Sequence, residues 1–514
     1  MNNTVQNKVS LEEILYYIMF SILLSTKGIG LDEGSILFRV CLIVASLLFV
    51  AKIFVGRYST REFIFIAVGL IWGIYSFINI GSFGIFVYVL MLFGMKNISV
   101  SKVMRVGAWV WGCCMFFTIT AAIFFDRTGV RLVHEKLGLG PLLRESLGYT
   151  HPNVLHISYI LLMVFVLYFC EKENIWRTIF VLMLGNAFVF IYSMSYTGVL
   201  ISAVLIVVFL YFEYRNNISK IENIIIQSIL PLCIGVSVVC PMILTDKMLL
   251  YFILNKILNN RIWAIQVFFV NYDITLLGEK ILASNYSIDN SFVYSLAWHG
   301  VLFFVGMTVA YWFLIRCYLK ENRKKELVII ISFLIAGLTE QFLFNASIKN
   351  ITVIFLGDIF FKYMKRNKRE YSLFGNGNVE VGLPLKWLGI GKEYLKDVLW
   401  KKIFFAFVLF SVITFGIISF IPMKSENAVY VYERLCDCNG ESVEYGEIEN
   451  ASNSLIIGNS TEKNAEYYFF SHENSNLIAV ANLQYRISLS IYISLGFVIM
   501  FILIDQFIRI MHKK

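Results

Sequence analysis

The chain has 514 residues, of which 58% are hydrophobic and only 15% are charged, and its mean hydropathy is +0.71. Because soluble domains carry about 25% charged residues, this composition excludes a single soluble globule and predicts a polytopic membrane protein. The net charge of +9 requires no nucleic-acid partner, since basic residues collect in the cytoplasmic loops of membrane proteins.

Apolar runs that can cross, or nearly cross, a bilayer follow one another along the chain, each approaching the roughly 20 helical residues that a crossing needs. Fourteen such runs centre on residues 12–26, 36–54, 62–80, 82–95, 105–125, 154–170, 177–192, 197–213, 223–245, 290–315, 326–344, 349–364, 402–422 and 488–508. We therefore expect an all-α fold with about 14 transmembrane helices.

Loop charge predicts the orientation of these helices. If the N-terminus is inside, most of the 44 Lys and Arg fall in inner segments, notably 316–325 and 362–402, although the outer loops contain more residues. The opposite orientation would reverse this bias. The positive-inside rule therefore favours a chain with both termini in the cytoplasm.

The remaining segments divide the chain into a transmembrane core (1–364), a basic cytoplasmic linker (365–400) and a C-terminal transmembrane hairpin (401–514). Attraction to anionic lipid headgroups is sufficient to explain the linker's charge. Within the hairpin, the acidic segment 423–487 predicts a small extracytoplasmic domain. The outer loops 126–153 and 246–289 are long. The second contains the interrupted apolar stretch 248–270, which predicts an amphipathic helix on the outer surface.

The stretch "RESLGYTHPNVL", residues 144–155, precedes the run that crosses from outside to inside. Pro152 suits the first turn of a helix, so His151 would cap that helix and Asn153 would lie in its first turn. The unpaired N–H groups and the helix dipole favour an anion there and keep His151 neutral. Arg144 is close enough in sequence to reach the same place.

Two further polar stretches open spans of the same direction. "SMSYTG" contains Ser195 and Thr197, and "SIDNSF" contains Asp289 and Asn290. Such residues are also ordinary helix caps. Arg261 lies between them, and its planar guanidinium suits phosphate. Glu340, in "GLTEQFLFN", has no cation in its own segment, and an ionisable residue within a span is a candidate functional group.

Several of these motifs resemble the bacterial polysaccharide polymerases of the Wzy type, within the O-antigen ligase-like superfamily. "RESLGYTHPNVL" is similar to that family's Arg followed by S-L-G-F-x-H-P-N-x-L, with Tyr149 in place of Phe. "RIWAIQ" from Arg261 and "IDNSFVYSLAWHG" resemble two further elements, and the resemblance covers roughly residues 100–364. Tyr196 stands where related proteins have Arg, and Arg144 is the candidate to replace that phosphate contact. Asp289 stands where the ligases have His, which favours a polymerase.

The resemblance implies a bacterial cytoplasmic-membrane glycosyltransferase that acts extracytoplasmically. Oligosaccharide repeat units on undecaprenyl pyrophosphate would be joined into capsular, exopolysaccharide or O-antigen-type chains, with undecaprenyl pyrophosphate as the leaving group. Arg261 and Arg144 would stabilise the pyrophosphate, and His151 or Asp289 would be the general base. Asn153, Asn290, Ser195 and Thr197 would bind substrate, and Glu340 would position an Arg or the acceptor. The account requires no cofactor and no metal, and a flippase and a chain-length regulator are candidate partners.

Three alternatives remain open. An O-antigen ligase-like enzyme differs only in its acceptor. A lipid-linked sugar flippase or transporter would place charges near mid-membrane. A different glycosyltransferase could use Asp32 and Glu33 with a divalent cation, although these residues are also read as a helix cap.

Overall fold

The computed structural model describes residues 9–125, 129–136, 139–258, 260–281, 288–341, 345–364, 371–372, 380–381, 398–421, 428–437, 441–448, 454–458, 465–471 and 475–511. This part of the chain is mostly helical, and eight of its helices are long and apolar enough to cross a membrane. Such an architecture is that of a polytopic membrane protein.

The long helices lie within the apolar runs that the sequence predicts. They are α2 (Ile36–Val55), α3 (Thr60–Ile80), α5 (Val100–Phe124), α7 (Ile175–Ser193), α8 (Tyr196–Tyr214), α9 (Lys220–Ile234) with its continuation into α10 (Cys240–Ile243), α13 (Ser291–Lys320) and the apolar part of α19 (Ser475–Met511). Short polar motifs fix several helix starts. Ser59 and Glu62 form a capping box at α3, and Ser219 and Glu222 form one at α9.

The other predicted spans correspond to α1 (Leu11–Gly28), α4 (Gly84–Phe93), α6 (Pro152–Tyr168), α14 (Lys324–Ala336), α15 (Val353–Met364) and α17 (Val398–Ile418). Of these helices, α4, α14 and α15 are shorter than the predicted spans. The predicted spans 326–344 and 349–364 are wrong in their boundaries, because the chain is not helical at 337–341 and 345–352. Polar side chains explain this break. Asn350 donates from Nδ2 to the carbonyl of Asn345 and to the Tyr311 hydroxyl, so side chains satisfy groups of the non-helical backbone.

The segment 248–270, which was predicted to lie outside, contains two helices instead of the single one predicted. α11 (Leu249–Ile257) and α12 (Arg261–Asn271) are separated at Asn260, which has a φ of 61°. Asn tolerates this left-handed conformation better than most residues. Both helices expose apolar side chains: α11 exposes Leu249 and Phe252, and α12 exposes Val270.

The segments predicted to lie outside also contain strands, so the all-α prediction is wrong there. β3 (Arg131–Lys136) and β4 (Gly140–Glu145) form an antiparallel hairpin within the long predicted loop 126–153. In the C-terminal segment, β7 (Ala428–Tyr432), β9 (Glu441–Glu444), β10 (Ser454–Ile457) and β11 (Glu466–Ser471) form a sheet in the order β10-β7-β11-β9. Strand β7, "AVYVY", alternates buried valines with tyrosines, a pattern that suits a half-buried sheet.

This C-terminal sheet lies within the segment 423–487, for which a small folded domain was predicted, but the sheet does not extend to the end of that segment. Helix α19 begins at Ser475, so residues 475–487 belong to the helix and extend it beyond the predicted span. Of the linker 365–400, the structure describes β5 (Tyr371–Ser372), β6 (Glu380–Val381) and the first residues of α17. β5 pairs with β2 (Arg57–Tyr58), and β6 pairs with β1 (Val9–Ser10). The remainder of the linker lies outside the described residues.

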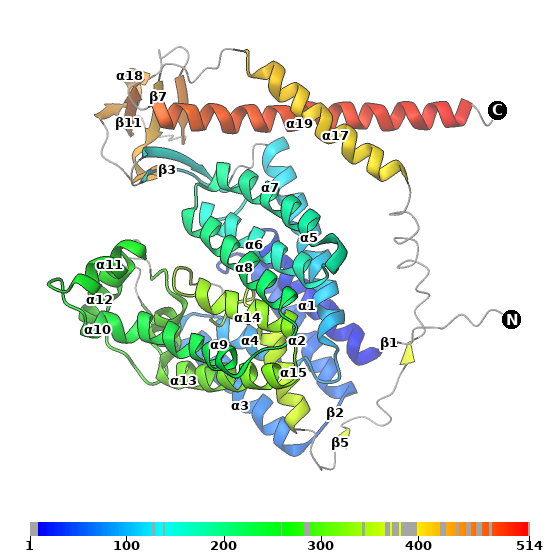
Figure 1. Cartoon of the computed structure of the whole chain (residues 1–514), viewed down its shortest axis with the longest axis vertical. Helices are drawn as coiled ribbons and strands as arrows, with labels where there is room; N and C mark the ends of the chain where they lie inside the picture. Colours follow the sequence, from blue (N-terminus) through cyan, green and yellow to red (C-terminus); the bar gives the residue numbers. More distant parts are fainter. Residues whose placement is uncertain are drawn as a thin grey trace.

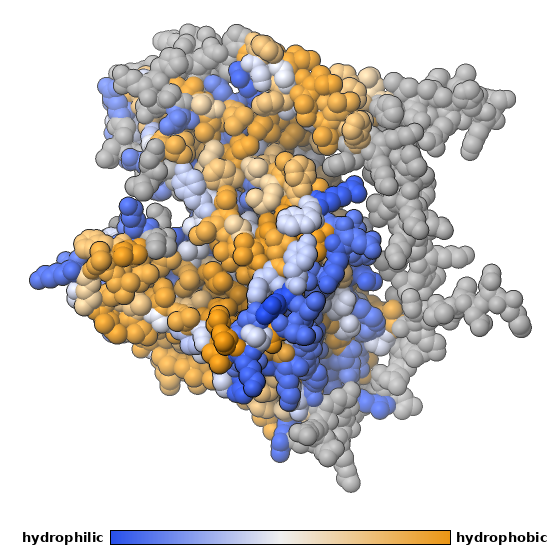
Figure 2. Space-filling view, viewed as in Figure 1, coloured by the Kyte–Doolittle hydropathy of each residue, from blue (hydrophilic) through white to orange (hydrophobic). Residues whose placement is uncertain are grey.

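Different elements lie at the two ends of the helical bundle. Figure 1 shows β1 and the C-terminal end of α19 on the right, and the C-terminal sheet with α11 and α12 on the left. The surface is notched on the left between that sheet and the apolar surface of α11 and α12 (Figure 2). Helix α6 lies inside the bundle and is buried along most of its length. Its N-terminal end therefore begins within the protein, close to the hairpin β3–β4.

Candidate functional site

The start of α6 forms one end of the site. His151 caps the helix, because its Nδ1 accepts a hydrogen bond of 3.1 Å from the N–H of Asn153. The Arg144 guanidinium reaches across from β4 and donates from Nη2 to Oδ1 of Asn153 at 2.5 Å. The neutral His151 ring therefore carries its hydrogen on Nε2 and can donate from that atom.

Arg144 joins this end to the junction between α7 and α8. Its side chain is only 5% exposed, and Nε donates to the carbonyl of Ser193 at 2.8 Å. The chain reverses at Met194, whose φ is 46°, and Ser195 then caps α8 through the N–H of Gly198. The Ser193 hydroxyl accepts from the N–H of Ser195 at 3.3 Å. Arg144 and Ser193 thus connect the N-terminal turn of α6 to the cap residue of α8 by hydrogen bonds.

Thr197 connects this junction to Glu340, which lies beyond the end of α14. The hydroxyls of Ser195 and Thr197 are 3.2 Å apart, and Thr197 donates to Oε1 of Glu340 at 3.0 Å. The backbone carbonyl of Glu340 accepts from the Ser291 hydroxyl at the start of α13. Glu340 therefore touches the N-terminal turns of both α8 and α13.

Arg261 forms the other end of the site, at the first residue of α12. Its Nε donates to the backbone carbonyl of Asp289 at 3.1 Å, and its Nη2 is 3.6 Å from Oδ2 of the same residue. Asn290 caps α13 by accepting from the N–H groups of Phe292 and Val293. Helix α12 and the start of α13 are thereby held together.

Every predicted site residue belongs to this single connected arrangement. The connections run from His151 and Asn153 through Arg144, Ser195, Thr197 and Glu340 to the start of α13, where Asn290 and Asp289 meet Arg261. This series of contacts links three helix N-termini to two largely buried guanidinium groups. Helix N-termini and guanidinium groups both attract anions, so the arrangement can bind a polyanionic group.

Burial sets the charge state of the carboxyl group at the centre. Burial and, to a smaller extent, the carboxylate of Asp289 raise the pKa of Glu340 from 4.5 to about 7, against the lowering effect of Arg261. Glu340 is 3% exposed. Its proton can therefore be exchanged near neutral pH, which is the range in which a proton-transferring group is most effective.

A second polar cluster, which the sequence-based prediction missed, supports the α6–α8 contact. His156 is fully buried in α6 and hydrogen-bonds the Ser193 hydroxyl at 3.0 Å and Oδ1 of Asn186 at 2.8 Å. A Cβ on Gly198 would lie 2.3 Å from the His156 ring, so only glycine permits this approach of α8. A histidine five residues after His151 within an apolar run was the signal available in the sequence.

Lys349, also missed, lies in the non-helical segment 345–352 and is 4% exposed. Its Nζ is 3.4 Å from the Ser158 hydroxyl on α6. A lysine inside an apolar region is a functional candidate by the same reasoning as Glu340. It was missed because it was counted as the first residue of the predicted span 349–364.

The alternative pair in the first outer loop lies in a different environment. Glu33 pairs with Lys27 at 3.0 Å, and Ser35, rather than Asp32 or Glu33, caps α2. Within the described residues, no three His, Cys, Asp or Glu side chains are grouped so as to hold a metal ion.

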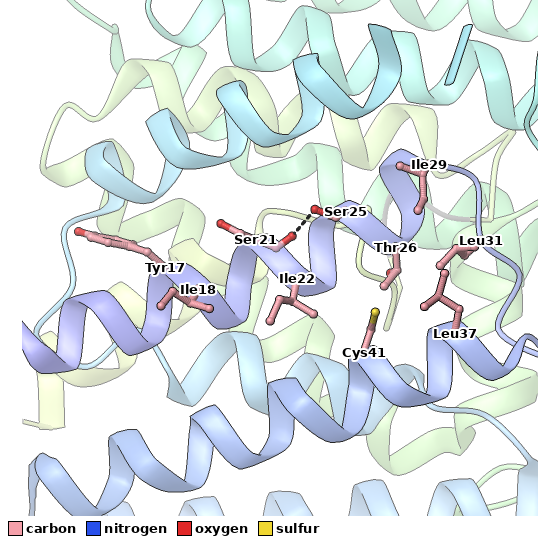
Figure 3. A pocket seen from close by; sticks show the side chains of 10 residues that line it. All are labelled: Tyr17, Ile18, Ser21, Ile22, Ser25, Thr26, Ile29, Leu31, Leu37 and Cys41. Atoms are coloured by element: carbon pink, nitrogen blue, oxygen red, sulfur yellow. Dashed lines mark hydrogen bonds between the residues drawn. The ribbon is translucent and has the colours of Figure 1, made fainter. Parts of the chain in front are cut away.

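A pocket of about 400 Å³ lies along α1 and α2, where Ile22, Leu37 and Cys41 line it. Figure 3 shows that Ser21 and Ser25 also line this pocket and that the Ser25 hydroxyl donates a hydrogen bond to the Ser21 carbonyl. Its lining includes none of the predicted site residues.

Comparison with known proteins finds no match: no family model, no curated protein and no solved structure is similar to this chain. The site therefore has to be interpreted from its own geometry and chemistry.

Proposed function

We propose that the protein is a membrane glycosyltransferase that polymerises undecaprenyl-pyrophosphate-linked oligosaccharide repeat units. The observation that carries the proposal is the connection of Arg144 to Arg261 through the N-termini of α6, α8 and α13. A pyrophosphate leaving group requires concentrated positive potential, and the two guanidinium groups and the helix N-termini are the proposed source of it. The resemblance of residues 144–155 to polysaccharide polymerases points to the same chemistry.

The reaction is a substitution at the anomeric carbon of the growing chain. The acceptor hydroxyl oxygen forms a bond to that carbon, and the bond from the carbon to the pyrophosphate oxygen breaks. Undecaprenyl pyrophosphate leaves with the electron pair, and a base takes the hydroxyl proton. Arg144, Arg261 and the helix N-termini stabilise the developing negative charge.

The geometry favours Asp289 over His151 as the base. The side chain of Asp289 is 33% exposed, so it can reach an acceptor hydroxyl. His151 uses Nδ1 to cap α6 and can donate from Nε2, which suits a phosphate oxygen. Glu340 orients the Thr197 hydroxyl and balances Arg261. Asn153 accepts a hydrogen bond from Arg144, and Asn290 caps α13 next to Asp289.

The orientation is part of the proposal. About 14 helical segments, with both termini in the cytoplasm, would place the helix N-termini and the exposed apolar face of α11 and α12 at the outer leaflet. The lipid carrier's diphosphate and the site would then lie at the same depth, at the surface of a bacterial cytoplasmic membrane.

The proposal is tested with purified protein in proteoliposomes that contain lipid-linked repeat units. We expect a ladder of carrier-linked products that lengthen by one unit at a time. Transfer of a finished chain to a different acceptor, without a ladder, would identify a ligase. Movement of the lipid-linked unit between leaflets, without any glycosidic bond formed, would identify a flippase. Either result would contradict the polymerase assignment.

A further inference from the structure

The sheet β10-β7-β11-β9, strand β8 and helix α19 together are called the C-terminal unit here. This unit is directly attached to the β3–β4 hairpin, which bears Arg144. Strand β8 (Cys436–Asp437) pairs in parallel with β3, at Val133 and His134, so the hairpin and the C-terminal segment share one sheet in the order β4-β3-β8. The three-stranded sheet thus joins residues about 300 positions apart in the chain.

An apolar core strengthens this attachment. Val133 and Leu143, on the two hairpin strands, are buried against Val429 and Val431 of β7 and Leu477 at the start of α19. The hairpin therefore loses much of its apolar contact if the C-terminal unit moves away. Figure 1 shows β3 lying beneath the C-terminal sheet and the left end of α19.

Gln484 on α19 makes the contact nearest to the site. Its Nε2 donates to the carbonyl of Leu143 at 3.1 Å and to the carbonyl of Ile191 at 2.8 Å, and the residue is 3% exposed. Leu143 immediately precedes Arg144, and Ile191 lies two residues before Ser193, whose carbonyl accepts from Arg144. Gln484 therefore bridges the same two segments, β4 and the end of α7, that Arg144 itself connects.

Helix α7 in turn holds Gln484. The Tyr192 hydroxyl donates to the backbone carbonyl of Gln484 at 3.0 Å and lies 2.7 Å from the Ser488 hydroxyl. Strand β4 is at the edge of its sheet, where one side of a strand faces no neighbouring strand. The Gln484 side chain supplies the donor for the Leu143 carbonyl of this edge strand. Gln484 is therefore held both by the hydrogen bonds that its side chain donates and by the one that its backbone carbonyl accepts.

We propose that Gln484 is a positioning residue for Arg144, and that through it the C-terminal unit sets the geometry of the anion-binding site. The inference rests on the proposed function only for its catalytic consequence. Its structural consequence, the immobilisation of β4 against α7, holds independently of the reaction. The C-terminal unit is then part of the machinery that keeps the guanidinium in place.

The test compares Gln484→Met, which keeps the length of the side chain and removes both donors, with the full-length wild type. Asn476→Leu is the matched control, because Asn476 is an exposed residue of the same helix whose side chain donates to Leu139, just before β4, and not to a residue beside Arg144. Amide hydrogen exchange across 140–145 in nanodiscs should quicken at least about fivefold in the Met variant and not in the control. Tyr192→Phe, which removes one hydroxyl, should show a smaller change and remains informative if the Met variant does not fold.

The catalytic consequence is measured as a double-mutant cycle. Gln484→Met should lower the polymerisation rate by about tenfold in the wild-type background and by little in an Arg144→Ala background, since the two residues act as one unit. An equal loss in both backgrounds, or unchanged exchange in both the Met and Phe variants, would overturn the inference. If the wild type forms no ladder, the proposed function fails, and the exchange measurement still decides the positioning role.

Discussion

Thr197 donates a hydrogen bond of 3.0 Å to Glu340, although 143 residues separate them in the chain. This contact joins the first turn of α8 to the segment that follows α14, and the Glu340 carbonyl extends the connection to α13. A carboxyl group that the sequence places alone in an apolar run thus lies among the caps of two helices. The predictions below follow from this arrangement.

Arg261 should be required for turnover. Arg261→Ala should lower the polymerisation rate by about 100-fold or more, since removing one donor that stabilises a developing oxyanion costs that much. Arg261→Lys should recover only part of the rate, because an ammonium lacks the planar two-oxygen fork. Lys256→Ala, which removes an exposed cation from neighbouring α11, is the control and should behave as the wild type. A fully active Arg261→Ala protein would remove Arg261 from the site.

His151 should have two separable roles. His151→Asn keeps a side chain that caps helices well, whereas His151→Ala removes the cap at a cost of about 1 kcal/mol. Thermal unfolding in detergent should therefore show destabilisation for Ala and little for Asn. If the ring donates to the leaving group, both variants should lose at least about tenfold in rate. Wild-type activity in the Asn variant would leave His151 with the capping role alone.

The pH dependence should report the ionisation of Glu340. Because its pKa is raised to about 7, the carboxyl is protonated below that pH and charged above it. The charged form accepts from Thr197 and balances Arg261, so we expect the rate to rise as the pH increases through about 7. Glu340→Gln should abolish this rise. Asp273→Asn, at an exposed acid of the same outer region, should retain it. A rise that persists in the Gln variant would assign the titration to another group.

Gly198 should tolerate no side chain. A Cβ there would lie 2.3 Å from His156, whereas a Cβ on Gly306 of α13 would meet nothing within 4 Å. Gly198→Ala should therefore destabilise the protein by about 1–3 kcal/mol through overpacking. Gly306→Ala should be neutral or slightly stabilising, because alanine is the better helix former. The melting temperatures of the two variants in one detergent give the comparison, and equal values would contradict the tight α6–α8 contact.

Cysteine labelling in a cysteine-free background should establish the orientation. Asn271, at the end of α12, and Asn216, between α8 and α9, are both exposed. In intact cells an impermeant maleimide should label a cysteine at 271 and should label one at 216 only after permeabilisation. The reverse pattern would place the proposed site in the cytoplasm and would exclude the proposed function.

Much of the fold follows from local properties of the sequence. The long apolar runs around α2, α3 and α5 become helices because a chain in a bilayer must satisfy its own backbone hydrogen bonds. The breaks at 337–341 and 345–352 could not be predicted this way. Their polar residues are spaced among Leu, Ile and Phe, and the groups that satisfy them, such as Tyr311, come from distant helices.

At the site, the order of residues along the chain is enough to predict which of them stand at helix starts. Capping by His151, Ser195 and Asn290 depends on neighbours two or three positions away, and such contacts are encoded locally. The three-dimensional arrangement was needed to find that hydrogen bonds link these helix starts, that Arg144 reaches Ser193, and that Gln484 binds the strand beside it. Those contacts join segments tens to hundreds of residues apart, and long-range packing of the helices, rather than any local pattern, brings them within hydrogen-bonding distance.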